Sequence, residues 1–219
     1  PRFEGMQEHF ANEVTDGHAR RTLMKLTGLI HDIGKPATKS IEPSGRMRFF
    51  GHADEGARIA GVALRRLRLG RRGVRLATTM IRHHLRPRQM AQDGALPTPR
   101  AVHRYYRDLG DAALDTLYLN MADFLAARGP ELTEGQMAEQ SQVIAHILNV
   151  GLQSKGPSQP VQRLIDGKDI MAEFGLGPGP LVGMLLSAVA EAEATGRLNT
   201  TEEAMELARA RLKSGGVCA

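Results

Sequence analysis

Apolar residues recur at helical spacing along nearly all of this 219-residue chain, whereas the alternation expected of half-buried strands is scarce. Aromatic residues make up only 4% and tryptophan is absent, so the core must consist mainly of Leu, Ala, Val, Ile and Met. Such a core favours packed helices over sheets. The sequence therefore predicts an all-α fold. We expect helices over about residues 19–33, 52–69, 73–85, 99–109, 112–127, 137–150 and 181–194, and a last helix capped by Thr200 or Thr201.

The chain is expected to divide into a main body and a tail. Residues 152–160 are polar and contain two prolines, which is typical of a linker. We therefore assign residues 1–151 to the main helical body and residues 152–219 to a linker and a smaller helical tail. Residues 37–51, which include Pro43, Ser44 and Gly45, are expected to form a loop or a small hairpin.

The cysteine content indicates the compartment. Cys218 is the single cysteine and cannot form an intrachain disulfide, which fits a reducing compartment, and we predict a cytoplasmic protein. No apolar run approaches the length of a membrane span, so we expect no membrane partner.

Positive charge is concentrated in one segment. Twelve arginines lie between Gly61 and Gly110 and are opposed only by Asp93 and Asp108, which gives this segment a charge of +10 in a chain of net charge +5. Arginine suits phosphate better than lysine does, because its planar fork donates two parallel hydrogen bonds. The segment predicts either a phosphate-rich partner or the solvated surface of an arginine-rich protein.

His31 and Asp32 stand side by side inside the apolar stretch Leu29-Ile30-His31-Asp32-Ile33-Gly34-Lys35-Pro36. Helical spacing of the preceding apolar residues places the pair at the inner end of a buried helix, which Pro36 prevents from continuing. A buried carboxylate needs a cation or a hydrogen-bonded partner. A plain His–Asp hydrogen bond in the core is the simplest interpretation of the pair alone.

Three further segments carry His or Asp where an apolar residue would be expected. His52 begins a helix on its apolar face, His83 and His84 end the next helix, and Asp123 lies on the most apolar helix. Each could be a satisfied core residue, but together with the His31–Asp32 pair they indicate one metal site. Imidazole and carboxylate without sulfur suit Mg, Mn, Ni, Fe, Co or Zn.

These segments carry a family resemblance. The stretch from Leu29 to Pro36, with Phe50-Gly51-His52, Ile81-Arg82-His83-His84 and Met121-Ala122-Asp123, resembles the HD superfamily of metal-dependent phosphohydrolases. The sequences of these motifs are most similar to those of the HD domain that follows the nucleotidyltransferase head in bacterial tRNA nucleotidyltransferases and poly(A) polymerases. The tail fits the same branch, with Gly167-Lys168-Asp169-Ile170-Met171 and Gly177-Pro178-Gly179-Pro180. The resemblance implies an HD-domain helical bundle that acts on phosphate esters of nucleotides or RNA ends, such as 2′,3′-cyclic phosphates.

The resemblance also implies roles for individual residues. His31, Asp32 and Asp123 would be primary metal ligands, and His52, His83 and His84 would be ligands of a second metal or would face the substrate. A metal held there would lower the pKa of a bound water and polarise a phosphoryl oxygen. Asp32 or Asp123 would orient the water. Lys35 would neutralise charge on the phosphate, unless it only complements a helix dipole. Phosphate or RNA would be bound by the arginines Arg82, Arg86, Arg104 and Arg107.

One feature of the family pattern is missing. The family's motif begins with another histidine on an earlier helix, at a distance that here reaches the start of the chain. We expect that this ligand and the nucleotidyltransferase head lie before Pro1, with His9 as an outside candidate for the ligand. The alternative function is a non-catalytic helical RNA-binding body of a tRNA-processing enzyme with a vestigial HD site. In that case Tyr105 and Tyr106, between Arg104 and Arg107, would help to grip tRNA.

Overall fold

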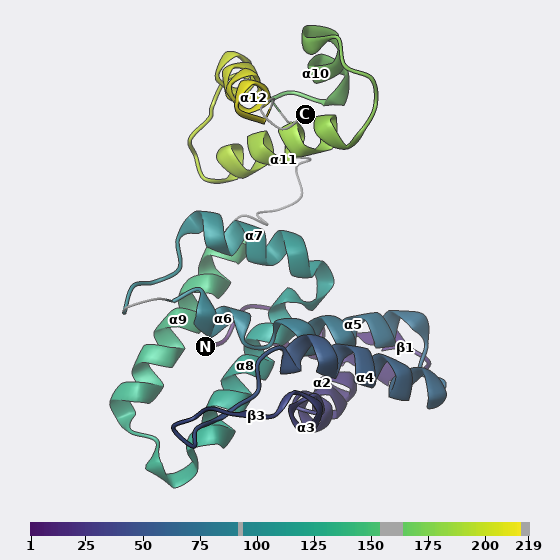
Figure 1. Cartoon of the computed structure of the whole chain (residues 1–219), viewed down its shortest axis with the longest axis vertical. Coiled ribbons are helices and arrows are strands. Elements are labelled where there is room, and N and C mark those ends of the chain that lie inside the picture. Colours follow the sequence, from purple (N-terminus) through teal and green to yellow (C-terminus); the bar gives the residue numbers. More distant parts are fainter. Residues whose placement is uncertain (92–93, 154–163, 216–219) are drawn as a thin grey trace. The chain divides into compact units, whose positions relative to one another are not determined.

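The computed structural model describes residues 1–91, 94–153 and 164–215, and helices dominate this part of the chain (Figure 1). The all-α prediction is confirmed, since the strands form only two short hairpins. In chain order the elements are α1 (Met6–Ala11), β1 (Glu13–Thr15), β2 (His18–Ala19), α2 (Arg20–Ile30), α3 (Lys35–Thr38), β3 (Ser40–Ile41), β4 (Met47–Arg48), α4 (His52–Arg66), α5 (Arg71–His83), α6 (Arg86–Gln89), α7 (Pro99–Leu109), η1 (Gly110–Ala112), α8 (Ala113–Arg128), η2 (Gly129–Glu131), α9 (Glu134–Gln153), α10 (Gly167–Phe174), α11 (Pro180–Ala194) and α12 (Thr201–Gly215).

The chain divides into two compact units. The first comprises Pro1–Thr98 and Tyr105–Val150, and the second comprises Pro99–Arg104 and Gly151–Ala219. Most of the expected linker falls on residues 154–163, which lie outside the described residues, as does Cys218.

Helices α2, α4, α5 and α8 form the core of the first unit. Helix α5 packs on α4, α2 and α8, and α2 also packs on α8. Leu23 of α2, Met80 of α5 and Leu119 of α8 are buried in one cluster, and Ala57, Ala60 and Ile81 form another between α4 and α5. Burial of these apolar side chains is the main force that holds the four helices together.

One expectation for α2 is wrong. The helix ends at Ile30, so His31 and Asp32 lie in the turn beyond it rather than at the inner end of a buried helix. Its buried face is formed by Leu23 and Thr27, whereas the Leu29 residue is 82% exposed. Leu29 follows Thr27 by two positions and therefore lies on the far side of the helix. When apolar residues lie on more than one side of a helix, the sequence does not show which face of the helix is buried in the core.

Only one of the two hairpins was predicted from the sequence. Strands β3 and β4 are antiparallel, with Ser40 opposite Arg48 and Ile41 opposite Met47, as expected for residues 37–51. Their turn contains Gly45 at φ +81°, a left-handed conformation that glycine adopts without strain. Hairpin β1–β2 was not predicted, and neither were the short helices α1, α3, α6 and α10.

Helices α10, α11 and α12 form the core of the second unit. Ile170, Leu185 and Val189 are buried there with Ala204 and Ala208 of α12. The predicted cap of the last helix is confirmed as Thr200. The Glu203 amide donates to its Oγ1 at 3.2 Å, and the Thr200 amide donates to Glu203 Oε2 at 3.3 Å.

Candidate metal centre

The turn that carries His31 and Asp32 is pressed against the start of α4. A Cβ atom on Gly34 would lie 2.2 Å from the His52 carbonyl oxygen and 2.5 Å from the Gly56 amide nitrogen. A Cβ atom on Gly56 would in turn meet His31 O at 3.4 Å. The two glycines therefore allow the backbones to approach closely, and this approach brings His52 to Asp32.

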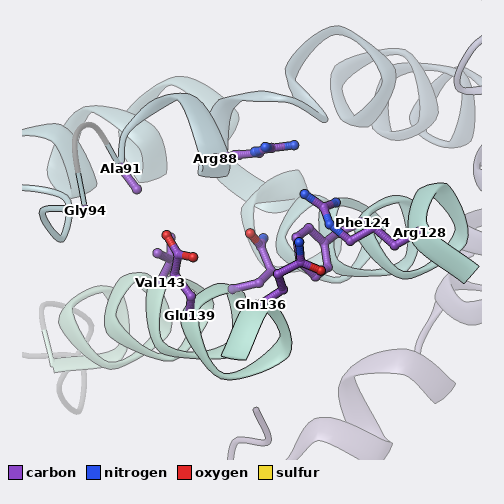
Figure 2. A pocket seen from close by; sticks show the side chains of 9 residues that line it. Arg88, Ala91, Gly94, Phe124, Arg128, Gln136, Glu139 and Val143 are labelled. Atoms are coloured by element: carbon purple, nitrogen blue, oxygen red, sulfur yellow. The ribbon is translucent and has the colours of Figure 1, made fainter. Parts of the chain in front are cut away.

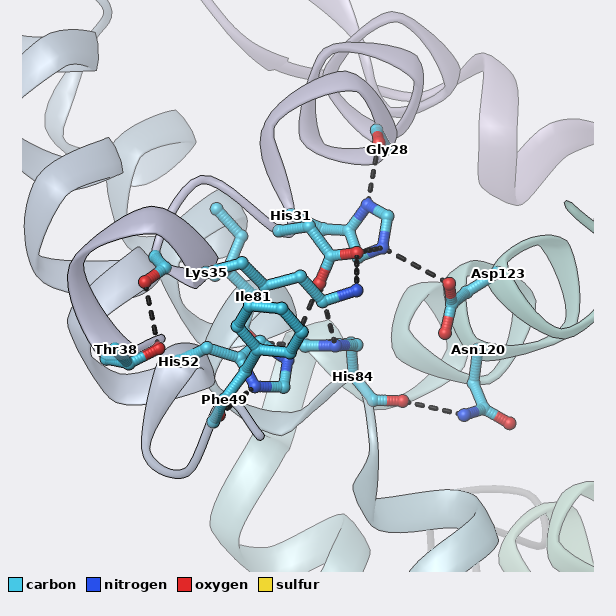
Figure 3. Close-up of polar contacts among 12 residues, drawn as sticks. Gly28, His31, Lys35, Thr38, Phe49, His52, Ile81, His84, Asn120 and Asp123 are labelled. Atoms are coloured by element: carbon cyan, nitrogen blue, oxygen red, sulfur yellow. Dashed lines mark hydrogen bonds and ion pairs between the residues drawn. The ribbon is translucent and has the colours of Figure 1, made fainter. Parts of the chain in front are cut away.

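Three histidines are oriented in the same way (Figure 3). His31 Nδ1 donates to Gly28 O at 2.8 Å, His52 Nδ1 donates to Phe49 O at 2.8 Å, and His84 Nδ1 donates to Ile81 O at 2.6 Å. A carbonyl only accepts, so each Nδ1 carries the hydrogen and each neutral ring has its lone pair on Nε2. Histidine ligands of protein metal sites are commonly oriented by such a bond from the other ring nitrogen.

The three Nε2 atoms converge on the carboxylate of Asp32. His31 Nε2 lies 3.3 Å from Oδ2, while His52 Nε2 and His84 Nε2 lie 3.5 Å and 3.9 Å from Oδ1. Lys35 Nζ donates to Oδ2 at 2.5 Å. Asp32 Oδ1 is buried and has no hydrogen-bond partner among the described residues. When the rings of His52 and His84 are neutral, their Nε2 lone pairs face this oxygen, and a cation held between them would compensate its charge.

Asp123 completes the cluster from α8. Its Oδ1 lies 3.3 Å from His31 Nε2. The hydrogen bonds to Asp123 and Asp32 outweigh burial and raise the pKa of His31 to about 10. The hydrogen bond with His31 lowers the pKa of Asp123. Burial raises the pKa of Asp32, but His31 and Lys35 outweigh this effect and lower it. The two carboxylates therefore stay ionised and stabilise positive charge on the His31 ring between them.

The donor set fits a divalent metal. Ligand atoms of His31, Asp32 and His84 all lie within 4.8 Å of one another, and His52 and Asp123 flank them. Nitrogen and carboxylate oxygen in this ratio suit first-row divalent ions. Burial lowers the pKa of His84, whose residue is 1% exposed, so its Nε2 lone pair is available for a metal.

A buried amide pair supports His84 from behind. Asn120 Nδ2 donates to the His84 carbonyl oxygen at 2.7 Å, and Gln140 Nε2 donates to Asn120 Oδ1 at 2.9 Å. Both residues are buried, so these bonds satisfy groups that water cannot reach. Neither residue was predicted from the sequence to support the site. Asn120 was visible as a polar residue on the most apolar helix, three positions before Asp123.

Several predicted site residues lie outside this cluster. No metal-ligating group among the described residues includes His83, whose pKa is lowered by burial and by Arg86 and Arg82. Each of the four predicted phosphate-binding arginines is paired with a carboxylate. Arg82 pairs with Asp54 at 3.1 Å, Arg86 and Arg107 pair with Asp108 at 2.8 and 2.9 Å, and Arg104 pairs with Glu191 at 2.9 Å.

His9 belongs to a different buried cluster. Its Nε2 lies 3.4 Å from Asp115 Oδ1, and Asp115 Oδ2 accepts a hydrogen bond from Arg20 at 2.5 Å. Asp115 is fully buried on α8. Neither Arg20 nor Asp115 was singled out in the sequence, although a carboxylate in so apolar a helix requires a partner. His9 is therefore not brought to the metal centre.

Comparison with known proteins identifies the class. Residues 5–128 match the HD domain family, which is more than half of the chain, so the chain belongs to that family. It is 38% identical over 182 residues to the "CC-adding tRNA nucleotidyltransferase" of Thermus thermophilus, covering 82% of this chain and 38% of that protein. It is 37% identical over 187 residues to the "A-adding tRNA nucleotidyltransferase" of Deinococcus radiodurans, covering 83% of this chain and 40% of that protein. The predicted family resemblance is confirmed, and the chain spans about two fifths of the length of these relatives.

Among the described residues, no helix combines the length and the apolar character that crossing a membrane requires.

Proposed function

We propose that this chain is a metal-dependent phosphohydrolase that acts on phosphate esters of nucleotides or RNA ends. The observation that carries the proposal is the convergence of three backbone-oriented Nε2 atoms on Asp32, whose Oδ1 has no hydrogen-bond partner within the described part of the chain. Membership of the HD family supports the reaction class. The relatives are named for tRNA, which supports an RNA end, and tRNA in particular, as the substrate.

The residues of the site divide the work. His31, Asp32 and Asp123 would hold the metal, with His84 and His52 as further donors. When bound, a divalent cation polarises a phosphoryl oxygen and acidifies a water molecule. The carboxylate with a free oxygen, on Asp32 or Asp123, orients the attacking water and accepts its proton. Lys35 Nζ, held at Asp32, supplies positive charge for the phosphate in the transition state.

Hydrolysis assays on metal-free and reloaded protein test this proposal. Metal-free protein is loaded in turn with Mg, Mn, Fe, Co, Ni or Zn and assayed on 2′,3′-cyclic AMP and on bis(p-nitrophenyl) phosphate. We expect activity after loading and its loss in EDTA. His31→Ala should lower activity about 100-fold or more, because it removes a metal donor.

His18→Ala is the matched control, because His18 is exposed on β2 and lies outside the cluster. It should retain the activity of the unaltered protein. Hydrolysis that survives both EDTA and His31→Ala would contradict the proposal.

The second candidate function is RNA binding without catalysis. It is favoured by the arginines of the basic segment that are exposed and have no ion-pair partner among the described residues, which are Arg65, Arg66, Arg68, Arg71 and Arg75. A tRNA titration at several salt concentrations tests it, since counterion release makes such binding weaken steeply with salt. Salt-dependent tRNA binding by a metal-loaded protein with no hydrolytic activity would favour this function.

We also propose that the whole protein carries a nucleotidyltransferase head, as the names and lengths of its relatives suggest.

A further inference from the structure

A second polar pocket lies between the end of α6, α8 and α9 (Figure 2). Its volume is about 300 Å³, which is at the small end of the range for ligand pockets and suits one small molecule. The side chains that give it its chemistry are those of Arg88, Phe124, Arg128, Gln136, Glu139 and Gln140. None of these residues is a candidate metal donor, although Gln140 also bonds to the Asn120 amide that supports His84.

The charged groups of this pocket are not neutralised by one another. Among the described residues, none of Arg88, Arg128 and Glu139 takes part in an ion pair, although all three line the same hollow. Two unpaired guanidiniums against one carboxylate leave a net positive charge. Guanidinium groups bind phosphate through parallel hydrogen bonds, so the pocket selects an anion with several oxygens.

Arg128 also offers a flat surface. Its guanidinium carbon lies 4.0 Å from the centroid of the Phe124 ring, so one face of the guanidinium rests on the ring. Nucleobases stack on aromatic rings and on arginine planes in the same way. Shielding the Phe124 ring from water would account for Arg128 alone. It does not account for the charged side chains of Arg88 and Glu139 in the same pocket.

One lining side chain, the carboxamide of Gln140, is held in place by its hydrogen bond to Asn120. Gln140 is 5% exposed, and its bond to Asn120 commits one of its amide protons. Gln136 and Glu139 stand beside it on α9 and point into the hollow (Figure 2). Carboxamides and carboxylates recognise the polar edges of bases and hydroxyl groups, which a simple inorganic anion lacks.

We propose that this pocket binds a nucleoside monophosphate unit, either free or as one residue of single-stranded RNA. Arg88 and Arg128 bind the phosphate, the base stacks on the Arg128 plane, and Gln136 and Glu139 bind the polar groups of the base or ribose. This assignment does not depend on the metal centre, because it uses a separate set of side chains.

Calorimetric titrations in EDTA test the proposal without contribution from a bound metal. The probes are AMP, inorganic phosphate and a short single-stranded oligoadenylate. We expect AMP to bind more tightly than phosphate, and Arg88→Gln or Arg128→Gln to weaken AMP binding about tenfold or more, because each removes a charge-assisted hydrogen bond. Arg46→Gln is the matched control, since Arg46 is exposed between β3 and β4, does not line the pocket, and the charge change is the same. It should leave AMP affinity unchanged.

A second variant separates anion binding from nucleotide recognition. Glu139→Gln removes a negative charge from the hollow, so it should tighten phosphate binding while reducing the preference for AMP over phosphate. Tighter binding of the oligonucleotide than of AMP would identify RNA as the source of the ligand, and the reverse order would identify a free nucleotide. The proposal is overturned if AMP binds no better than phosphate, if nothing binds at about 1 mM, or if Arg46→Gln weakens AMP binding as much as Arg88→Gln does.

Discussion

At the scale of single residues, the absence of a side chain at Gly34 matters as much as the ligands themselves. A Cβ there would meet the backbone of His52 and Gly56, and backbone atoms cannot be moved aside by a rotamer change. The separation of 3.5 Å between His52 Nε2 and Asp32 Oδ1 therefore depends on this glycine. Gly34 is therefore required for the close contact between the turn that carries His31 and Asp32 and the start of α4.

We predict that Gly34→Ala destabilises the first unit by about 1–3 kcal/mol, the usual cost of overpacking. The metal affinity should fall as well, because the turn must move away from α4. Urea unfolding and a nickel titration would measure both effects. Gly135→Ala is the control, because a Cβ at that helical position meets nothing within 4 Å. Equal stability of the two variants would rule out the steric role of Gly34.

At the scale of elements, an ion-pair cluster fixes the end of α2 opposite to the metal centre. Arg20 is 4% exposed and donates to Asp111 Oδ1 at 2.7 Å and to the buried Asp115 at 2.5 Å. These bonds attach the first turn of α2 to η1 and α8. Helix α2 is thus positioned against α8 by Arg20 at its start and by His31 and Asp123 beyond its end.

The Arg20 cluster predicts a pH dependence of stability. Burial raises the pKa of Asp111, but hydrogen bonds from Arg20 and Arg72 outweigh it and lower the pKa below the ordinary value of 3.8. A lowered folded-state pKa stabilises the fold above the unfolded value, and this contribution is lost as the pH falls through the folded value.

Urea unfolding of the unaltered protein and of Asp111→Asn at about pH 5 and pH 3 would measure this effect. The unaltered protein should be the more stable of the two at the higher pH, and the difference should shrink at the lower pH. Asp54→Asn, which removes an exposed carboxylate, is the control. A difference that does not change with pH would contradict the prediction.

The helical spacing of apolar residues predicted where helices lie better than it predicted which face of each helix is buried. The bounds of α7 match the expected residues 99–109, and α11 begins one residue before the expected start, because a proline marks the beginning of each helix. Of the six residues expected to converge, five lie together and His83 lies outside the cluster; the five are His31, Asp32, His52, His84 and Asp123. His83 and His84 are adjacent and differ by only about 100° around the helix, so spacing alone could not decide which of them faces the metal centre. The Asn120–Gln140 bond joins two successive α-helices, α8 and α9, but its partners are 20 positions apart, and no helical spacing signals such a bond.

At the scale of the whole molecule, the two units have separate apolar cores. The metal-centre residues and the second pocket belong to the first unit. The second unit has its own buried cluster around Leu185, which is fully buried. Stability of the second unit and metal binding should therefore respond to different substitutions.

We predict that Leu185→Ala destabilises the second unit by about 2–5 kcal/mol, through lost burial and the cavity left behind. Nickel affinity should stay unchanged, because every metal donor is in the first unit. Differential scanning calorimetry and a nickel titration would show the two effects. The neighbouring Met184→Ala, at a residue that is 55% exposed, should alter neither. A metal affinity that drops with Leu185→Ala would contradict the separation.

The three Nδ1–carbonyl hydrogen bonds have a consequence for metal selectivity. They fix the imidazole rings as the backbone folds, so the rotational entropy of the rings is lost during folding and not when the ion arrives. A donor cage assembled in advance cannot contract or expand freely around ions of different radius. The protein should therefore discriminate among divalent ions by size, and changes that loosen the last turns of α2 or α5 should broaden the range of ions accepted before they reduce affinity for the preferred one.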